Sequence, residues 1–300
     1  MATTLGVEAA RAVRRQAQAA RRDVQRATHR FAMERLVHRV FSGPAGGRFL
    51  LKGGMLMMLA EGAPDQYRAR TTTDIDLQAP GYRDGMAAFE AVLGTALSRV
   101  PDPDDGVRFD LDALRVETVR ERIPGCAVSV PAYVGTVKVR LKCDVTFDAR
   151  TRPDELVDAR LPSMLPGLAP LQVRHVPFEH VVADKVQSLC RHGPVSYRLR
   201  DYYDLYVILS GGAAPDREAA AEAMARTFAL FGAEVPEAVE DIAALADDAA
   251  RGLEPAWRKE LAARSFFVET PPLPEMAARI REAVAEILPL VPRPGALPPF

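Results

Sequence analysis

Two short segments, Lys52-Gly53-Gly54 and Arg70-Thr71-Thr72-Thr73-Asp74-Ile75-Asp76-Leu77, carry the most informative pattern in this chain. Residues 73–79 alternate acidic and aliphatic side chains, which predicts a strand with two different faces. Side chains two positions apart share one face of a strand, so Asp74 and Asp76 point the same way. Two neighbouring carboxylates repel each other unless a cation lies between them, and Mg²⁺ prefers oxygen ligands and phosphates. The pattern predicts a divalent metal site, although such an acid pair is also common by chance.

The glycine pair lies between two predicted elements, a short strand that ends near Leu51 and a helix that contains MLMMLA. Glycine lets backbone N–H groups approach a phosphate closely, and the N-terminus of the following helix favours an anion. Lys52 or Arg70 could then neutralise phosphate charge. A plain tight turn is the alternative interpretation of Gly53 and Gly54.

A further acid, Asp144, lies in the alternating run from Val137 to Val145. Lys138, Arg140, Lys142 and Asp144 share one face of this predicted strand, and the aliphatic residues share the other. A carboxylate here could complete a three-acid, two-metal site on a neighbouring strand. The alternating pattern alone favours a simpler interpretation, an ordinary exposed acid on an edge strand.

Two helices, over residues 178–192 and 197–210, carry the remaining candidate residues. Lys185 lies in the first helix. Asp201 and Asp204 lie three residues apart in the second helix, on roughly one face. Tyr202, Tyr203 and Tyr206 accompany them and could stack a base, but a position in the core is the favoured interpretation.

The remaining pattern predicts an α/β (α+β) protein with a mixed sheet and a helical C-terminal domain. A helix is expected over 7–41, another over 83–99, strands over 113–120 and 126–147, and helices from residue 215 onward. The predicted domains are a basic helical N-terminal segment (1–47), a catalytic core (48–175) and a helical C-terminal domain (176–300).

Composition indicates a cytoplasmic globular protein without a membrane span. The chain is 48% hydrophobic and 26% charged, and its start lacks the apolar core of a signal peptide. Three widely spaced cysteines argue against a structural zinc site. Residues 1–47 contain nine Arg and three acidic residues, a net charge of +6. A basic surface of this kind attracts phosphates, although a solvated helix face explains the charge equally well.

Together, these motifs resemble the AbiEii/AbiGii toxin family over residues 48–210. The shared pattern is KGG, then R-x-[ST]-x-DIDL, a strand Asp, a helical Lys, and R-x-[KR]-D-x-x-D-L. These bacterial toxins are nucleotidyltransferases with a DNA polymerase β-like fold. The resemblance therefore implies a polymerase β-like core for this chain.

The resemblance also assigns a role to each motif residue. Gly53 and Gly54 match the glycines that hold nucleotide phosphates, and Arg70 and Thr72 match the Arg and Ser/Thr that precede the metal-binding acids. The implied metal ligands are Asp74, Asp76 and Asp144. The other implied catalytic residues are Lys185, which contacts the nucleotide, and Asp201 and Asp204, which form the last acidic motif.

The expected function is Mg²⁺-dependent transfer of a nucleotide from an NTP to an RNA 3′ end, with tRNA as the leading acceptor, so that translation stops. Two Mg²⁺ ions and a cognate antitoxin are implied. One alternative is transfer to a protein or small-molecule hydroxyl, and another is a non-catalytic nucleotide-sensing protein; a glycosyltransferase is a weaker option. Phosphorylation of residues 71–73 would place negative charge beside the acids and could silence the site.

Overall fold

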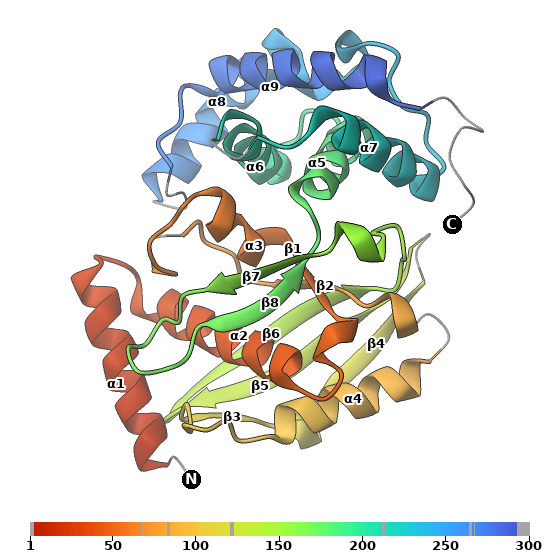
Figure 1. Cartoon of the computed structure of the whole chain (residues 1–300). Helices are drawn as coiled ribbons and strands as arrows, with labels where there is room; N and C mark the ends of the chain where they lie inside the picture. The colour runs from red at the N-terminus through yellow and green to blue at the C-terminus, as the bar shows by residue number, and fades with distance from the viewer. Residues whose placement is uncertain are drawn as a thin grey trace. The chain divides into compact units, whose positions relative to one another are not determined.

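The computed structural model divides the chain into two compact units (Figure 1). Unit 1 is Met1–Ala149 with Leu156–His175, and unit 2 is Arg150–Glu155 with Val176–Phe300. The residues described are 3–67, 69–82, 85–120, 123–211, 214–263, 266 and 268–292. The N-terminal segment 1–47 groups with unit 1.

Unit 1 is built on a mixed sheet of eight strands in its described part. The strands are β1 (Leu50–Lys52), β2 (Ile75–Gln78), β3 (Val107–Phe109), β4 (Arg115–Arg120), β5 (Pro124–Val134), β6 (Val137–Thr146), β7 (Val157–Leu161) and β8 (Leu171–His175). Their order is β3-β5-β6-β2-β1-β8-β7, and β4 pairs with β5. The pairs β1/β8 and β2/β6 are parallel and the other pairs are antiparallel. The strand β6 therefore lies inside the sheet, so the prediction of an edge strand is wrong.

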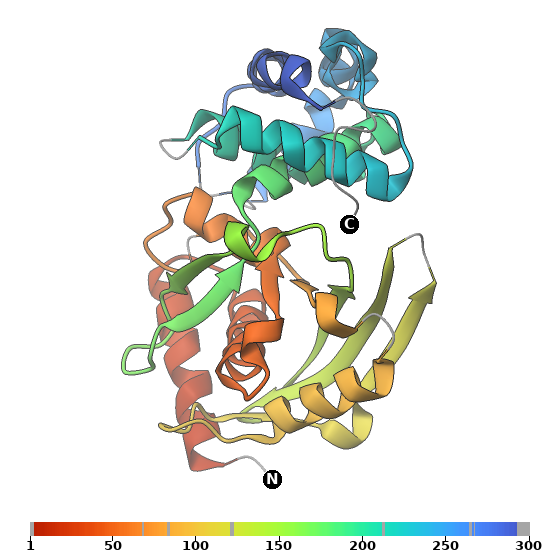
Figure 2. The same ribbon diagram turned by 45° about the vertical axis from the view of Figure 1, so that its right-hand side comes forward.

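Within the described ranges, four α-helices accompany this sheet: α1 (Thr4–Ala19), α2 (Val24–Ser42), α3 (Gly53–Ala60) and α4 (Met86–Ser98). Helix α2 packs against β5, β6, β8 and α4, and α1 packs against α2 and β5 (Figure 2). The rings of Phe49, Tyr82, Phe89 and Phe147 contact one another beside α4. Leu141, Cys143 and Val145 of β6 are buried in the core, whereas Val137 at the start of the strand is exposed. The alternate side chains, from Lys138 to Asp144, are exposed.

The single helix expected over residues 7–41 is two helices, α1 and α2. Helix α1 ends at Ala19, and Arg21 adopts a left-handed backbone with φ 54°. Asp23 then starts α2, because its carboxylate accepts a hydrogen bond from the backbone N–H of Arg26 at 2.8 Å. The expectation failed because the break contains neither Gly nor Pro. Asp23, a residue type that favours the N-cap position, was the feature of the sequence that could have indicated a second helix start.

Part of the basic charge of the N-terminal segment is buried. Arg30, Arg35 and Arg39 on α2 are at most 6% exposed. Arg30 donates to Gln66, and Arg35 and Arg39 pair with acidic partners inside unit 1. A sequence count of +6 therefore overstates the charge that this segment presents to solvent.

Unit 2 is helical in its described part: α5 (Phe178–His192), α6 (Leu199–Ser210), α7 (Arg217–Phe231), α8 (Asp247–Ala262) and α9 (Leu273–Ile287). Helix α5 packs against α6 and α7, while α9 packs against α6 and α8. The short segment 150–155 belongs here because Arg150 pairs with Asp184 of α5 at 2.5 Å and Glu155 pairs with Arg226 of α7 at 2.6 Å.

The two units confirm the expected fold class, a mixed α/β protein with a helical C-terminal part. Strands β3, β7 and β8 were not anticipated. Among the described helices, none has both the length and the apolar character that crossing a bilayer requires.

Candidate active site

One row of charged residues crosses three neighbouring strands of unit 1. Lys52 of β1 is the register partner of Asp76 of β2, and Asp76 is the register partner of Asp144 of β6. Neighbouring strands lie about 4.8 Å apart, and directly paired residues point to the same face. The sheet therefore places a cation and two carboxylates side by side, although Asp76 and Asp144 are 68 positions apart in the sequence.

The electrostatics at Asp144 reflect this arrangement. Partial burial, followed by the negative charge of Asp74, raises the pKa of the Asp144 carboxyl, while Lys52 and Lys142 oppose that rise. Asp74 precedes β2, and one of its carboxylate oxygens accepts hydrogen bonds from the backbone N–H and the hydroxyl of Thr73, at 3.1 and 2.9 Å. The negative charge of Asp74 thus disfavours the ionised form of Asp144, as expected for two carboxylates that lie near each other.

The glycine pair allows the start of α3 to approach the acids closely. Gly53 has φ +66°, and a Cβ built there would lie 1.8 Å from a carboxylate oxygen of Asp76. A Cβ on Gly54 would lie 2.4 Å from the hydroxyl oxygen of Thr72. Both positions therefore exclude a side chain. The sequence pattern predicts that the glycines bind phosphate, and the structure adds a second reason for them, close contact with Asp76 and Thr72.

Arg70 and Thr72 shape the loop that leads into β2, and both are buried, at 5% and 7% exposed. The backbone N–H of Arg70 donates to the carboxylate of Glu61 at the end of α3. The hydroxyl of Thr72 donates to the backbone carbonyl of Asp74 at 3.3 Å. These contacts position the loop that carries Asp74. Glu61 was not singled out from the sequence, because only the fold brings it to Arg70.

In unit 2, Lys185 lies between the two acids of the last motif. Its ammonium is 2.6 Å from an Asp201 oxygen and 3.2 Å from an Asp204 oxygen. Both carboxylates are buried, and Ser188 also donates to Asp201. Burial raises the pKa of Asp201, but Lys185, Ser188 and Arg198 bring it below its ordinary value. The two acids therefore position Lys185.

Two of the three neighbouring tyrosines belong to the core, and the third, Tyr206, is only partly buried, with the Arg279 guanidinium 5.9 Å from its ring centre. Tyr202 and Tyr203 are fully buried, and their hydroxyls bond to the backbone of residues 244 and 268. The favoured interpretation of these two residues as core is confirmed. Neither ring is available to stack a base.

The carboxylates of unit 1 would bind a cation such as Mg²⁺ only if a substrate supplied further oxygen ligands. Within the described ranges, no three His, Cys, Asp or Glu side chains are grouped closely enough to bind a metal ion on their own. Mg²⁺ in nucleotide enzymes usually takes one or two carboxylates and completes its shell with water and phosphate oxygens. The row formed by Asp76 and Asp144 fits that donor set.

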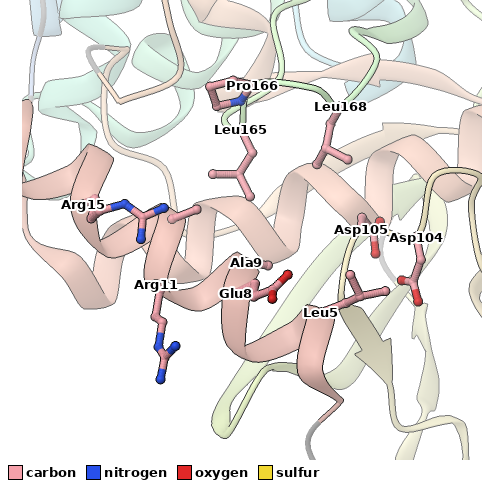
Figure 3. Close-up of a pocket in the computed structure, with 11 residues that line it drawn as sticks. Leu5, Glu8, Ala9, Arg11, Arg15, Asp104, Asp105, Leu165, Pro166 and Leu168 are labelled. Atoms are coloured by element: carbon pink, nitrogen blue, oxygen red, sulfur yellow. The ribbon is translucent and has the colours of Figure 1, made fainter.

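A pocket of about 450 Å³ lies elsewhere in unit 1 (Figure 3). Its walls include Arg11 and Arg15 of α1, Asp104, and the apolar side chains of Leu165 and Leu168. None of the site residues predicted from the sequence lines this pocket. The candidate site instead lies on the sheet, where Lys52 and Asp76 are half-buried and Asp144 is exposed.

Acidic residues on a sheet, next to a glycine turn at the start of a helix, suggest an enzyme that acts on a nucleotide. Comparison with known proteins agrees with this class. A family model described as nucleotidyl transferase AbiEii toxin, type IV toxin–antitoxin system, matches residues 35–287. The chain belongs to this family, and it is a nucleotidyltransferase. Membership in a toxin family of this kind implies a cognate antitoxin.

Two solved structures from Helicobacter pylori resemble the chain at 14% sequence identity. One, provisionally classed as a nucleotidyltransferase, has a TM-score of 0.49 and covers 89% of this chain and 96% of its own. The other, JHP933, has a TM-score of 0.48, with 89% and 93% covered. No curated protein matches the sequence. The family assignment rests on the family model alone.

Proposed function

We propose that this nucleotidyltransferase transfers a nucleotide from an NTP to the 3′ end of an RNA, tRNA foremost, in a Mg²⁺-dependent reaction that stops translation. One observation carries the proposal: the row of Lys52, Asp76 and Asp144 lies beside the glycine-lined start of α3. The family supports a nucleotidyltransferase toxin. The RNA acceptor, the metal and the effect on translation are the proposed part.

Asp76 and Asp144, with Asp74, are the residues that would hold Mg²⁺. The ion would supply positive charge to the nucleotide phosphates and to the departing pyrophosphate. The fit follows from the donor set, since carboxylate oxygens beside a phosphate cradle are the ligands that Mg²⁺ prefers. Partial burial, and then the charge of Asp74, raise the pKa of the Asp144 carboxyl, and the bound positive charge would offset the repulsion from Asp74.

The residues of the chain would perform the remaining work. Backbone N–H groups at the start of α3 would bind phosphate oxygens, and Lys52 would neutralise part of their charge. The RNA 3′ oxygen would attack the α-phosphorus, the bond from that phosphorus to the bridging oxygen would break, and pyrophosphate would leave with the electron pair. Asp144 would accept the proton of the attacking hydroxyl. Lys185 would offset charge on the triphosphate.

The direct test uses purified protein, total tRNA, Mg²⁺ and each of the four labelled NTPs in separate reactions. We expect label in RNA with one NTP or a subset of the four, lost on chelation of the metal. Asp76→Asn should lower the transfer rate about 100-fold or more, because the metal contributes several kcal/mol to transition-state stabilisation. Asp112→Asn, at an exposed acid of the same unit, is the matched control and should keep wild-type activity.

Other results would replace this proposal with one of its alternatives. Label in a protein or in a small molecule, with none in RNA, would refute the RNA acceptor and leave a transferase. Toxicity in cells that survives a double Asp74→Ala, Asp76→Ala substitution would indicate a non-catalytic mode of action.

A further inference from the structure

The exposed face of the sheet around Asp144 carries an unusual concentration of positive charge. We call the set of five exposed basic residues on β3, β4 and β6 the basic ladder: Arg108, Arg115, Lys138, Arg140 and Lys142. The sequence placed three of these residues on the same face as Asp144 without assigning them a role. Strand pairing in the sheet places the other two, Arg108 and Arg115, on the same face.

Strand register shows that the basic ladder shares one face with the candidate site. Lys142 pairs with Ser129, and Ser129 pairs with Arg115. Lys138 pairs with Tyr133, and Tyr133 pairs with Arg108. Directly paired residues on neighbouring strands point to the same face, so these two cross-strand rows are parallel to the row that contains Asp144.

Little in the described part of the chain neutralises these charges. None of the five basic residues has an ion-pair partner within 4 Å among the described residues. Some exposed Arg elsewhere do pair, as Arg251 does with Asp247 on α8. Two acids on β4 and β6 share this face, Asp144 and its cross-strand neighbour Glu117, so five cations face two carboxylates. A face with such an excess of cations attracts a polyanion.

At the far end of the basic ladder, two of its cations lie against an aromatic ring. The Arg108 guanidinium lies 4.3 Å from the centre of the Tyr133 ring, and the Lys138 ammonium lies 5.5 Å from it. Tyr133 is only partly buried. Aromatic rings and guanidinium planes interleaved with cations are typical of surfaces that bind single-stranded nucleic acid.

We propose that the basic ladder binds the single-stranded 3′ segment of the RNA acceptor and directs its terminal hydroxyl toward Asp144. This inference rests on the proposed function. The cations of β6, from Lys138 to Lys142, span four residue steps, about 13 Å, and Lys138 is about 20 Å from Asp144 along the strand. One triphosphate bound at the glycine turn is too short to meet all of them, whereas successive RNA phosphates could do so.

The test compares two triple substitutions that remove equal charge. Lys138→Gln/Arg140→Gln/Lys142→Gln removes the β6 part of the ladder, and Arg11→Gln/Arg14→Gln/Arg15→Gln removes three exposed cations of α1. Binding is measured by fluorescence anisotropy with a single-stranded RNA oligonucleotide, without NTP, over a range of salt concentrations. We expect the ladder variant to raise Kd at least tenfold and to reduce the slope of log Kd against log salt by about 2, since each lost phosphate contact removes about 0.7. The α1 variant should keep the wild-type slope.

Kinetic measurements distinguish loss of RNA binding by the basic ladder from an effect on the proposed metal site. The double variant Lys138→Gln/Arg140→Gln leaves Lys142, which is close to Asp144, in place. In this variant, KM for RNA should rise and KM for NTP should stay unchanged. A far-ultraviolet circular dichroism melt confirms folding, and the charge-preserving variant Lys138→Arg/Arg140→Lys should restore wild-type RNA binding.

The outcomes distinguish this inference from the function on which it rests. If wild-type protein labels RNA and the ladder variant binds and labels RNA as well as wild type, the inference is overturned and the function stands. If the ladder and α1 variants lose binding equally, net charge explains the effect and the inference is also overturned. If wild-type protein neither binds nor labels RNA, the proposed function fails with it.

Discussion

Gly53 determines how closely helix α3 can approach Asp76. Its φ of +66° lies in the left-handed region that side chains disfavour, and a Cβ there would overlap the Asp76 carboxylate. Gly62, at φ +58°, has the same kind of backbone, but a Cβ added there would have no atom within 4 Å. Substitution of Gly62 would therefore strain only the backbone, whereas substitution of Gly53 would also displace Asp76.

We expect Gly62→Ala to lower the free energy of unfolding by about 1–2 kcal/mol with nucleotide transfer retained, because only the backbone is strained. Gly53→Ala should lose a similar or larger amount of stability and also lose most transfer activity, because Asp76 must move. Urea unfolding and the RNA-labelling assay measure the two effects. Full activity of Gly53→Ala would show that the contact with Asp76 does not matter.

Asp144 shows both the value and the limit of a sequence pattern. Alternation along residues 137–145 correctly predicted that its side chain is exposed and opposite the apolar face. The same pattern favoured an incidental surface acid. The parallel pairing of β6 with β2 places Asp144 directly beside Asp76, which supports a role in the site.

Among the elements, segment 150–155 has the most unexpected position. It connects two strands of unit 1 but belongs to unit 2, where Glu155 receives hydrogen bonds from Arg226 at 2.6 Å and from the backbone N–H of Arg152 at 2.7 Å. Burial raises the pKa of Glu155, but hydrogen bonds from His180, Arg152 and Arg226 outweigh it and lower the pKa from 4.5 to about 2. A depressed carboxyl pKa stabilises the folded state above the unfolded-state value.

This stabilisation should be present above pH 4.5 and should disappear as the pH falls from 4.5 toward 2. We therefore expect Glu155→Gln to lower the free energy of unfolding by about 1–3 kcal/mol at pH 7 and to flatten its decline below pH 4.5. Glu218→Gln, at an exposed acid of α7, should change neither. Chemical denaturation at several pH values tests this, and an unchanged acid limb in Glu155→Gln would contradict it.

Across the whole molecule, the candidate catalytic residues are divided between the two units. The acids and the glycine turn belong to unit 1, and Lys185 with its two positioning acids belongs to unit 2. The acids that are proposed to hold Mg²⁺ all lie in unit 1.

The substitution Lys185→Met tests whether Lys185 takes part in nucleotide transfer. We expect it to lower kcat for nucleotide transfer at least tenfold, because a cation that offsets charge on the triphosphate is lost. RNA binding measured without NTP should be unchanged. Lys259→Met, at an exposed lysine of α8, is the matched control and should behave as wild type. Wild-type kinetics in Lys185→Met would remove this residue from the mechanism.

Local features of this protein were readable from its residues alone: the alternation of β2 and β6, the helices of unit 2, and the motif residues that resemble the family. Each depends on neighbours within a few positions, where helix and strand periodicity acts. Long-range features were not readable from the local pattern, although the family resemblance grouped Asp144 with Asp74 and Asp76 as implied metal ligands. The pairing of Asp76 with Asp144, the contact of Gly53 with Asp76, the interior position of β6 and the burial of three N-terminal arginines all depend on segments that meet only in the folded chain. Hydrogen-bond pairing between distant strands leaves no local periodic signal, so the fold alone forms the charged row and the basic ladder beside it.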